Sequence, residues 1–313
     1  MKFSFTLALA LIPLAWGAAI EKRASTSDVA TTGYASTGSG TTGGKGGATV
    51  TVSTLAALTS AAAGDAASII LVSGTITGNT VVRVGSNKSI IGKSGAALVG
   101  VGLRVLEKKN VIIRNLKISK VLAEAGDAIG IQAASQVWVD HVEISSDRDH
   151  DKDFYDGLLD VTHGCTGITV SYSIFRDHWK GVLVGHSDSN ASEDTAIRVT
   201  FHNNYWYNLN SRLPSFRFGQ GHIYGNVFEN SSDGINTRVG AQLLVQNNIF
   251  SGVSKPIYAT DGGFAVAQGN DFGGKTNTAP AGTLTSVPYA YTLDAVSSLR
   301  SKVVGVAGAN LGF

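Results

Sequence analysis

One short pattern recurs along most of the chain, and it restricts the fold more than any other feature. The copies share alternating β-branched residues, a polar position and a return to apolar residues. They recur roughly every 20 to 30 residues as VIIRNLKI (111–118), VWVDHVEI (137–144), ITVSYSIF (168–175), IRVTFHNN (197–204), GHIYGNVF (221–228) and LLVQNNIF (243–250). A period of this size is typical of a structural unit that stacks on its own next copy.

The repeats predict strands without intervening helices. Strand alternation dominates, and helical periodicity is nearly absent, between residues 80 and 260. We therefore expect an all-β parallel β-helix, a single-stranded solenoid in which each coil pairs with the next. Asn115, Asn226 and Asn247 near the polar corners suit this fold, because asparagine tolerates the left-handed conformation. The competing β-sandwich requires two-residue Asn-Gly or Asp-Gly turns, which are scarce here.

The two ends of such a stack need covers. Ser53 followed by TLAALTSAAAG predicts a short N-terminal helix, capped at Ser53 and ending at Gly64, that covers the first coil. Residues 291–305, YTLDAVSSLRSKVVG, predict an amphipathic segment that packs back on the barrel.

The N-terminus predicts export from the cell. Lys2, an apolar run and the small residues 17–19 form a signal peptide over residues 1–18; a buried N-terminal helix is the alternative. Residues 19–23 form a short pro-segment that ends in the dibasic Lys22-Arg23, and 24–313 form one domain. No second apolar run is long enough to span a membrane, so we expect a released, extracellular protein.

Composition excludes several other classes. The net charge is +2 and charged residues make up 15% of the chain, so no basic stripe is available for nucleic acid. Cys165 is the only cysteine, so no intramolecular disulfide can form, and we expect it to be a buried apolar residue rather than a catalytic thiol. Asn87, Asn190 and Asn230 begin glycosylation sequons. Nothing in the sequence indicates an oligomer, so we expect a monomer.

Acidic residues collect between positions 145 and 160, in SSDRDHDKDFYDGLLD. The interval 147–153 is expected to be a solvated loop, and an EF-hand is disfavoured because its glycine and its final glutamate are missing. Asp156 and Asp160 are four residues apart, which places them on one side of a strand. Asp127 lies about one coil below them, so the three carboxylates could bracket a Ca²⁺ ion.

Three cations follow on the next coils: Lys180 in FRDHWKGV, then Arg212 and Arg217 in SRLPSFRFG. Little negative charge is nearby in the sequence to pair with the two arginines. A strip of acids beside a strip of cations suits a polyanion that is bridged to the acids by a metal and bound by the cations directly. His141 and His178 lie in the same regions, and we expect both to be hydrogen-bonded structural residues.

These motifs together resemble the pectate lyase/pectin lyase superfamily (polysaccharide lyase family 1), especially its secreted fungal pectate lyases. The matching segments are VWVDH, DGLLDV, ITVSYSIF and RLPSFRFG, in family order, and the likeness extends from about Gly33 to the C-terminus. It implies a right-handed parallel β-helix and Ca²⁺-dependent β-elimination of polygalacturonate or low-methyl pectin.

The resemblance also implies roles for single residues. Asp127, Asp156 and Asp160 match the Ca²⁺ ligands, Arg212 matches the residue that takes the C5 proton, and Lys180 and Arg217 match cations that bind substrate carboxylates. One departure concerns the position two residues before Asp127. Some relatives have a second acid there, whereas this chain has Ala125, next to Glu124.

Three other functions are alternatives to a pectate lyase. A pectin lyase acts on methyl-esterified polymer without Ca²⁺ and should lack the three acids. A glycoside hydrolase needs a carboxylate pair at hydrolytic spacing, and no suitable pair is evident. A non-catalytic β-helical polyuronate-binding protein explains the fold but gives Lys180, Arg212 and Arg217 no purpose.

Overall fold

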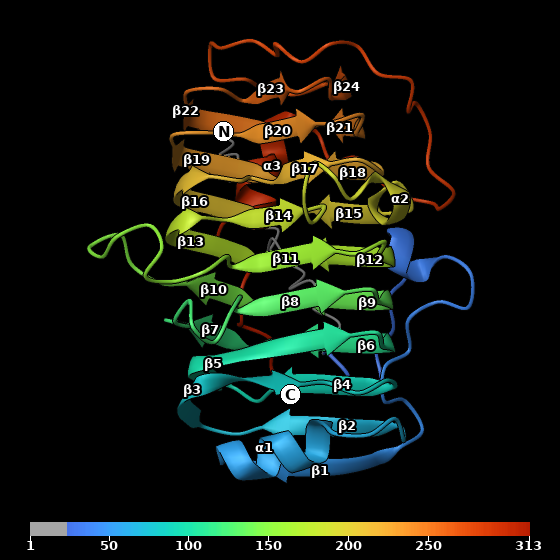
Figure 1. The fold of residues 1–313 in the computed structure, drawn as a ribbon, viewed down its shortest axis with the longest axis vertical. Coiled ribbons are helices and arrows are strands. Elements are labelled where there is room, and N and C mark those ends of the chain that lie inside the picture. Colours follow the sequence, from blue (N-terminus) through green and yellow to red (C-terminus); the bar gives the residue numbers. More distant parts are fainter. Residues whose placement is uncertain (1–23) are drawn as a thin grey trace, which may run out of the picture.

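A computed structural model describes residues 24–313. The signal peptide and the pro-segment predicted for residues 1–23 lie outside the described residues. The chain winds into a parallel β-helix whose coils stack along one long axis (Figure 1). Neighbouring coils pair in parallel, which confirms the predicted fold and excludes the β-sandwich, because that fold needs antiparallel hairpins.

Two sheets of 10 and 14 strands form the walls of the helix. The first contains β1 (Ala48–Val52), β2 (Ser68–Val72), β4 (Lys88–Gly92), β6 (Lys109–Arg114), β9 (Ser135–Asp140), β12 (Thr166–Ser171), β15 (Arg198–His202), β18 (Gln220–Tyr224), β21 (Gln242–Gln246) and β24 (Phe264–Gln268).

The second sheet forms two faces. One contains β7 (Lys117–Ser119), β10 (Glu143–Ser145), β13 (Ile174–Lys180), β16 (Tyr205–Ser211), β19 (Val227–Ser231) and β22 (Ile249–Val253). The other contains β8 (Ile129–Gln132), β11 (Leu159–Thr162), β14 (Val182–Val184), β17 (Ser215–Arg217), β20 (Ile235–Arg238) and β23 (Ile257–Thr260). The long strand β5 (Ala97–Leu106) joins the faces, because it pairs with both β7 and β8, and β3 (Thr75–Arg83) lies beside it.

Five of the six predicted repeats prove to contain parts of two strands and the corner between them, whereas 197–204 ends in the corner before β16. The first corner residue takes a left-handed conformation at Asn115 (φ 54°), His141 (φ 49°), Tyr172 (φ 44°) and Asn247 (φ 47°). The expectation for Asn115 and Asn247 is therefore confirmed. Asn226 has a different role, because it is the second residue of its corner, is fully buried and donates through Nδ2 to Asn248 Oδ1 at 2.9 Å. Such a ladder satisfies buried backbone groups at successive corners.

The core is a column of apolar side chains inside the coils. Its rings continue from one coil to the next, with Phe175, Trp206, Phe228 and Phe250 stacked at centroid distances of 4.5, 5.4 and 4.6 Å. Each added coil therefore extends the same core, which suits a chain of this length with one cysteine.

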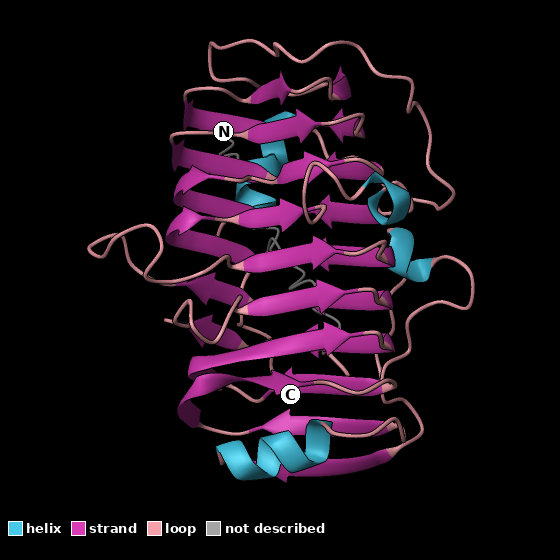
Figure 2. Ribbon diagram, in the orientation of Figure 1, coloured by secondary structure: helices cyan, strands magenta, loops and turns pink. Residues whose placement is uncertain are grey.

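A helix covers the N-terminal end of the solenoid, further helices lie on its sides, and a loop passes over the other end (Figure 2). Helix α1 (Leu55–Ala62) covers the first coil as predicted, but its N-cap is Thr54 rather than Ser53, since the Thr54 hydroxyl accepts from Ala57 N–H at 3.2 Å. Helix α3 (Val296–Val303) is shorter than predicted and packs Leu299 and Val303 on the barrel. The remaining helices are α2 (Ala191–Asp194) and the 3₁₀ turn η1 (Tyr34–Ser36). In residues 24–313, no helix has the length and apolar character needed to cross a bilayer.

Candidate active site

The three predicted acids lie on two neighbouring coils. Asp127 precedes β8, Asp156 precedes β11, and Asp160 lies within β11, which pairs with β8. The acids therefore lie on adjacent coils, as predicted. The prediction that Asp156 and Asp160 point to one side of a single regular strand does not hold. Strand β11 begins only at Leu159, and Leu158 is buried as well, so Asp156 and Asp160 do not follow one regular alternation.

The carboxylates of Asp127 and Asp160 converge beside Gly157. A Cβ atom placed on Gly157 would lie 2.9 Å from Asp127 Oδ1 and 2.6 Å from Asp160 Oδ1. The Gly157 N–H donates to Asp127 Oδ1 at 3.1 Å, and the Leu183 N–H donates to Asp160 Oδ1 at 3.3 Å. The missing side chain thus leaves a small space between two anionic oxygens, and such a donor set fits a hard cation.

The pKa values of Asp127 and Asp160 also indicate that two negative charges are held close together. Burial, together with the charge of Asp156, raises the pKa of Asp127 to about 7, although Arg104 and Arg212 oppose the shift. Burial and the charge of Asp127 raise the pKa of Asp160 well above its usual value. Two carboxylates that resist ionisation together would be relieved by a bound divalent cation.

Asp156 is engaged differently. Its Oδ1 accepts from Lys180 Nζ at 3.3 Å, and Lys180 also donates to Asp153 Oδ1 at 3.2 Å. In the part of the chain that the structure describes, no three His, Cys, Asp or Glu side chains are grouped closely enough to hold a metal. The structure therefore brings the carboxylates of Asp127 and Asp160 together, whereas the carboxylate of Asp156 forms an ion pair with Lys180.

The two arginines of the RLPSFR segment differ in their surroundings. Arg212 adopts φ 66° between β16 and β17, and its guanidinium forms no hydrogen bond or ion pair with any residue in 24–313. Its positive charge acts on Asp127 and Asp160. Arg217, by contrast, donates to Asp188, so the expectation that both arginines lack a partner in this chain is wrong for Arg217.

Three further residues border the site and were not predicted. Arg104 on β5 exerts its charge on Asp127. Arg238 pairs with Arg217 in the strand ladder and shares Asp188 with it, at 3.2 Å. Trp179 lines a cavity of about 290 Å³ beside Lys180. The positions of Arg104 and Arg238 near the site follow only from the strand register between coils. Trp179 could have been predicted, because it is next to Lys180 in the sequence.

The other predicted features have structural roles. Asp149, Asp151 and Asp153 are exposed in the loop between β10 and β11, as expected. Cys165 is buried, and burial raises the pKa of its thiol to about 12, which suits an inert residue. Burial lowers the pKa of His178 to about 4, so this side chain is neutral, and its Nε2–H donates to the Asp156 carbonyl at 2.5 Å.

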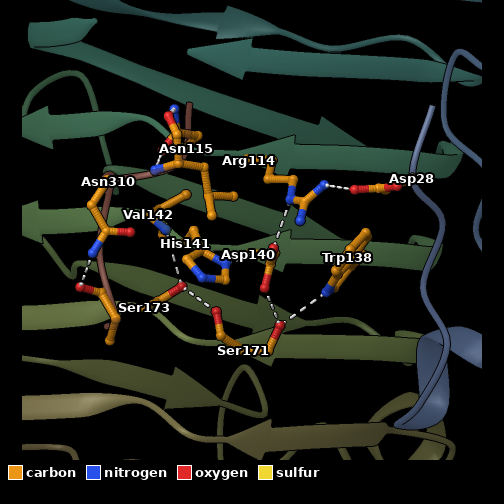
Figure 3. Close-up of polar contacts among 12 residues, drawn as sticks. Asp28, Arg114, Asn115, Trp138, Asp140, His141, Val142, Ser171, Ser173 and Asn310 are labelled. Carbon is orange, nitrogen blue, oxygen red and sulfur yellow. Dashed lines mark hydrogen bonds and ion pairs between the residues drawn. The ribbon is translucent and has the colours of Figure 1, made fainter. Parts of the chain in front are cut away.

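A larger cavity, of about 740 Å³, lies away from these residues over β6, β9 and β12. Figure 3 shows its polar network, in which Arg114 Nε donates to Asp140 at 2.7 Å and Ser171 Oγ donates to Asp140 at 2.6 Å. Trp138 Nε1 donates to Ser171 Oγ at 2.9 Å, and His141 Nδ1 lies 2.8 Å from Asp140. Among the described residues, none of the buried polar atoms without a partner belongs to this cavity, so its side chains serve the fold.

Known proteins match this arrangement closely. A family model described as pectate lyase matches residues 7–310. The probable pectate lyase A of Aspergillus fumigatus is 60% identical over 310 residues, covering 98% of this chain and 96% of that protein. Pectate lyase A of Aspergillus niger is 58% identical over 295 residues, covering 93% and 91%. The crystal structure of a pectate lyase from Bacillus sp. N165, in complex with trigalacturonate, has a TM-score of 0.81 and 32% identity, covering 90% of this chain and 99% of that one. The chain belongs to the pectate lyase family.

Proposed function

We propose that this protein is a secreted, monomeric, calcium-dependent pectate lyase. It cleaves (1→4)-α-D-galacturonan by β-elimination and leaves 4,5-unsaturated galacturonosyl ends. The observation that carries the proposal is the acid pair of buried Asp127 and half-buried Asp160, which lies within reach of the charge of Arg212, a guanidinium without an ion pair among residues 24–313. This combination suits an anionic substrate held at a metal beside a cationic group.

The acids would hold the metal. Asp127 and Asp160 already converge at Gly157, and Asp156 would complete the set by exchanging Lys180 for the ion. A bound Ca²⁺ would supply Lewis-acid stabilisation of the negative charge that develops on the substrate carboxylate. Lys180, released from Asp156, would then be free to bind that carboxylate or its neighbour.

The chain's own residues position the sugar and move the proton. Arg217 binds a substrate carboxylate once Asp188, an exposed residue, gives way. Arg212, in its neutral form, accepts the C5 proton as the C5–H bond breaks. The electron pair of that bond forms the C4=C5 double bond, and the C4–O bond breaks. The glycosidic oxygen leaves with a proton from water.

Product mass separates elimination from hydrolysis, because only hydrolysis adds a water to the fragments. We expect mass spectrometry of digested polygalacturonate to find, for each bond cleaved, one fragment with a 4,5-unsaturated end, lighter by one water than the hydrolysis product of the same length. In Arg212→Lys, kcat should fall by about 100-fold or more, since lysine loses the geometry of the guanidinium. Arg176→Lys, on another face and paired with Glu143 at 2.7 Å, is the matched control and should turn over normally. Cleavage without unsaturated fragments, or near-normal turnover in Arg212→Lys, would refute the assignment.

A further inference from the structure

Arg104 lies on the same ladder as the acid pair. Strand pairing aligns Arg104 with Gly130, and Gly130 with Asp160. Leu103 and Val105 on either side of Arg104 are buried in the core, so Arg104 faces outward, as Asp160 does. With coils about 4.8 Å apart, Arg104 lies two coils from Asp160 on the outer face that carries the site.

The guanidinium of Arg104 lacks a hydrogen-bonding partner among the residues that the structure describes. It forms no hydrogen bond or ion pair with any residue in 24–313, although its Nε atom is buried. Arg217 and Arg238 both pair with Asp188, and Lys180 pairs with Asp153 and Asp156. A buried donor without an acceptor is costly, so an unpaired arginine here needs an external acceptor.

Glycines make room for this side chain. A Cβ atom on Gly126 would lie 2.6 Å from Arg104 Nη2, and one on Gly130 would lie 3.5 Å from Arg104 Nε and 3.7 Å from Asp127 Oδ2. The guanidinium and the Asp127 carboxylate therefore flank one glycine.

The loop before Asp127 supplies no ion-pair partner to Arg104. Position 125 is alanine, and Glu124 accepts a hydrogen bond from Asn79. Glu124 therefore does not replace the acid that is absent at position 125, and Asp127 is the acid whose charge Arg104 acts on.

We infer that Arg104 binds a carboxylate of the polyuronate, on the sugar next to the one held at the acid pair. This inference rests on the proposed function. Arg104 on β5, Asp127 just before β8, Asp160 on β11 and Arg217 on β17 belong to one face, whose strands are ordered β5, β8, β11, β14 and β17, so a polymer lying along the helix axis meets them in turn. Because Arg104 is a cation beside Asp127, it also opposes metal binding in the absence of substrate.

Two opposite effects distinguish this role from a structural one. In Arg104→Gln, we expect KM for polygalacturonate to rise about tenfold with kcat nearly unchanged, since a charged hydrogen bond to substrate is lost. The dissociation constant for Ca²⁺ alone, measured by titration calorimetry without substrate, should fall about fivefold because a repelling charge is removed. Arg104→Lys keeps the charge and should retain wild-type Ca²⁺ affinity. Lys93→Gln, an exposed cation after β4, is the matched charge control and should change neither quantity.

The outcomes separate the possibilities. A higher KM with tighter Ca²⁺ binding supports the inference. Weaker binding of both ligands would mean that Arg104 only supports the fold around Asp127, and no change in either would mean that it has no role; both results overturn the inference. Absence of unsaturated product from the wild-type protein overturns the proposed function itself, and it is seen before any variant is compared.

Discussion

Gly157 offers a direct perturbation of the acid pair. In Gly157→Ala, the new methyl group would lie 2.6 Å from Asp160 Oδ1 and 2.9 Å from Asp127 Oδ1. To restore an ordinary contact of 3.4 Å, the Asp160 oxygen must move by about 0.8 Å, and the Asp127 oxygen by somewhat less. Displacements near 1 Å at reacting groups reduce rates by about 100-fold. We therefore expect Ca²⁺ affinity to fall about 10- to 100-fold, with a similar loss in kcat/KM.

The measurement is calorimetric titration of Ca²⁺ into both proteins, with initial rates on polygalacturonate at saturating Ca²⁺. The atoms in the way are the ends of two side chains, so thermal unfolding should change little. Gly130→Ala, one coil below, is the matched control, because its methyl group would meet no atom closer than 3.5 Å and should bind Ca²⁺ normally. Unchanged Ca²⁺ affinity in Gly157→Ala would refute the assignment of the metal to this pair.

Three further predictions concern other parts of the molecule. Asp188→Asn removes the competitor for Arg217, so KM for polygalacturonate should fall about two- to fivefold in steady-state assays; an unchanged KM would count against Arg217 as a substrate ligand. Asn226→Ala leaves buried groups of the ladder unpaired, and urea unfolding should report a loss of about 2–4 kcal/mol; a loss well below about 1 kcal/mol would contradict a structural ladder. Burial lowers the pKa of His222 from 6.5 to about 4, so the unfolded chain binds a proton in this window that the folded chain does not. Stability should therefore fall by about 3 kcal/mol as the pH drops from 6.5 to 4, and His222→Gln should flatten this dependence; equal slopes in both proteins would disprove it.

The fold was predictable because its signal is local and repeated. Every repeat carries its own corner, and residues such as Asn115 and Asn247 mark the left-handed positions directly. The end helices were also predictable, but their limits were not. Ser53 and Thr54 are adjacent and both residue types are suitable caps, so the sequence does not show which of the two hydroxyls accepts the capping hydrogen bond.

The candidate site was predictable only in part. The sequence motifs identified the acids and the cations, but they did not indicate that Asp156 pairs with Lys180 or that Arg217 pairs with Asp188. The role of Arg104 was hidden for a related reason. Residues 104, 130 and 160 share one ladder at spacings of 26 and 30 residues, so loops of unequal length separate neighbours in space. Which residues align on neighbouring coils is therefore known only from the folded structure, because the sequence spacing between them varies.

The central claim is metal-assisted elimination of a polyuronate at the acid pair. The most direct test follows the ultraviolet absorbance of unsaturated product when the purified protein acts on polygalacturonate, first with Ca²⁺ and then with a chelator. The account predicts that absorbance rises with Ca²⁺, stops with chelator and resumes when Ca²⁺ is restored. Activity that is indifferent to the chelator, especially on highly methyl-esterified pectin, would contradict the calcium-dependent reaction, and no unsaturated product from either polymer would contradict elimination altogether.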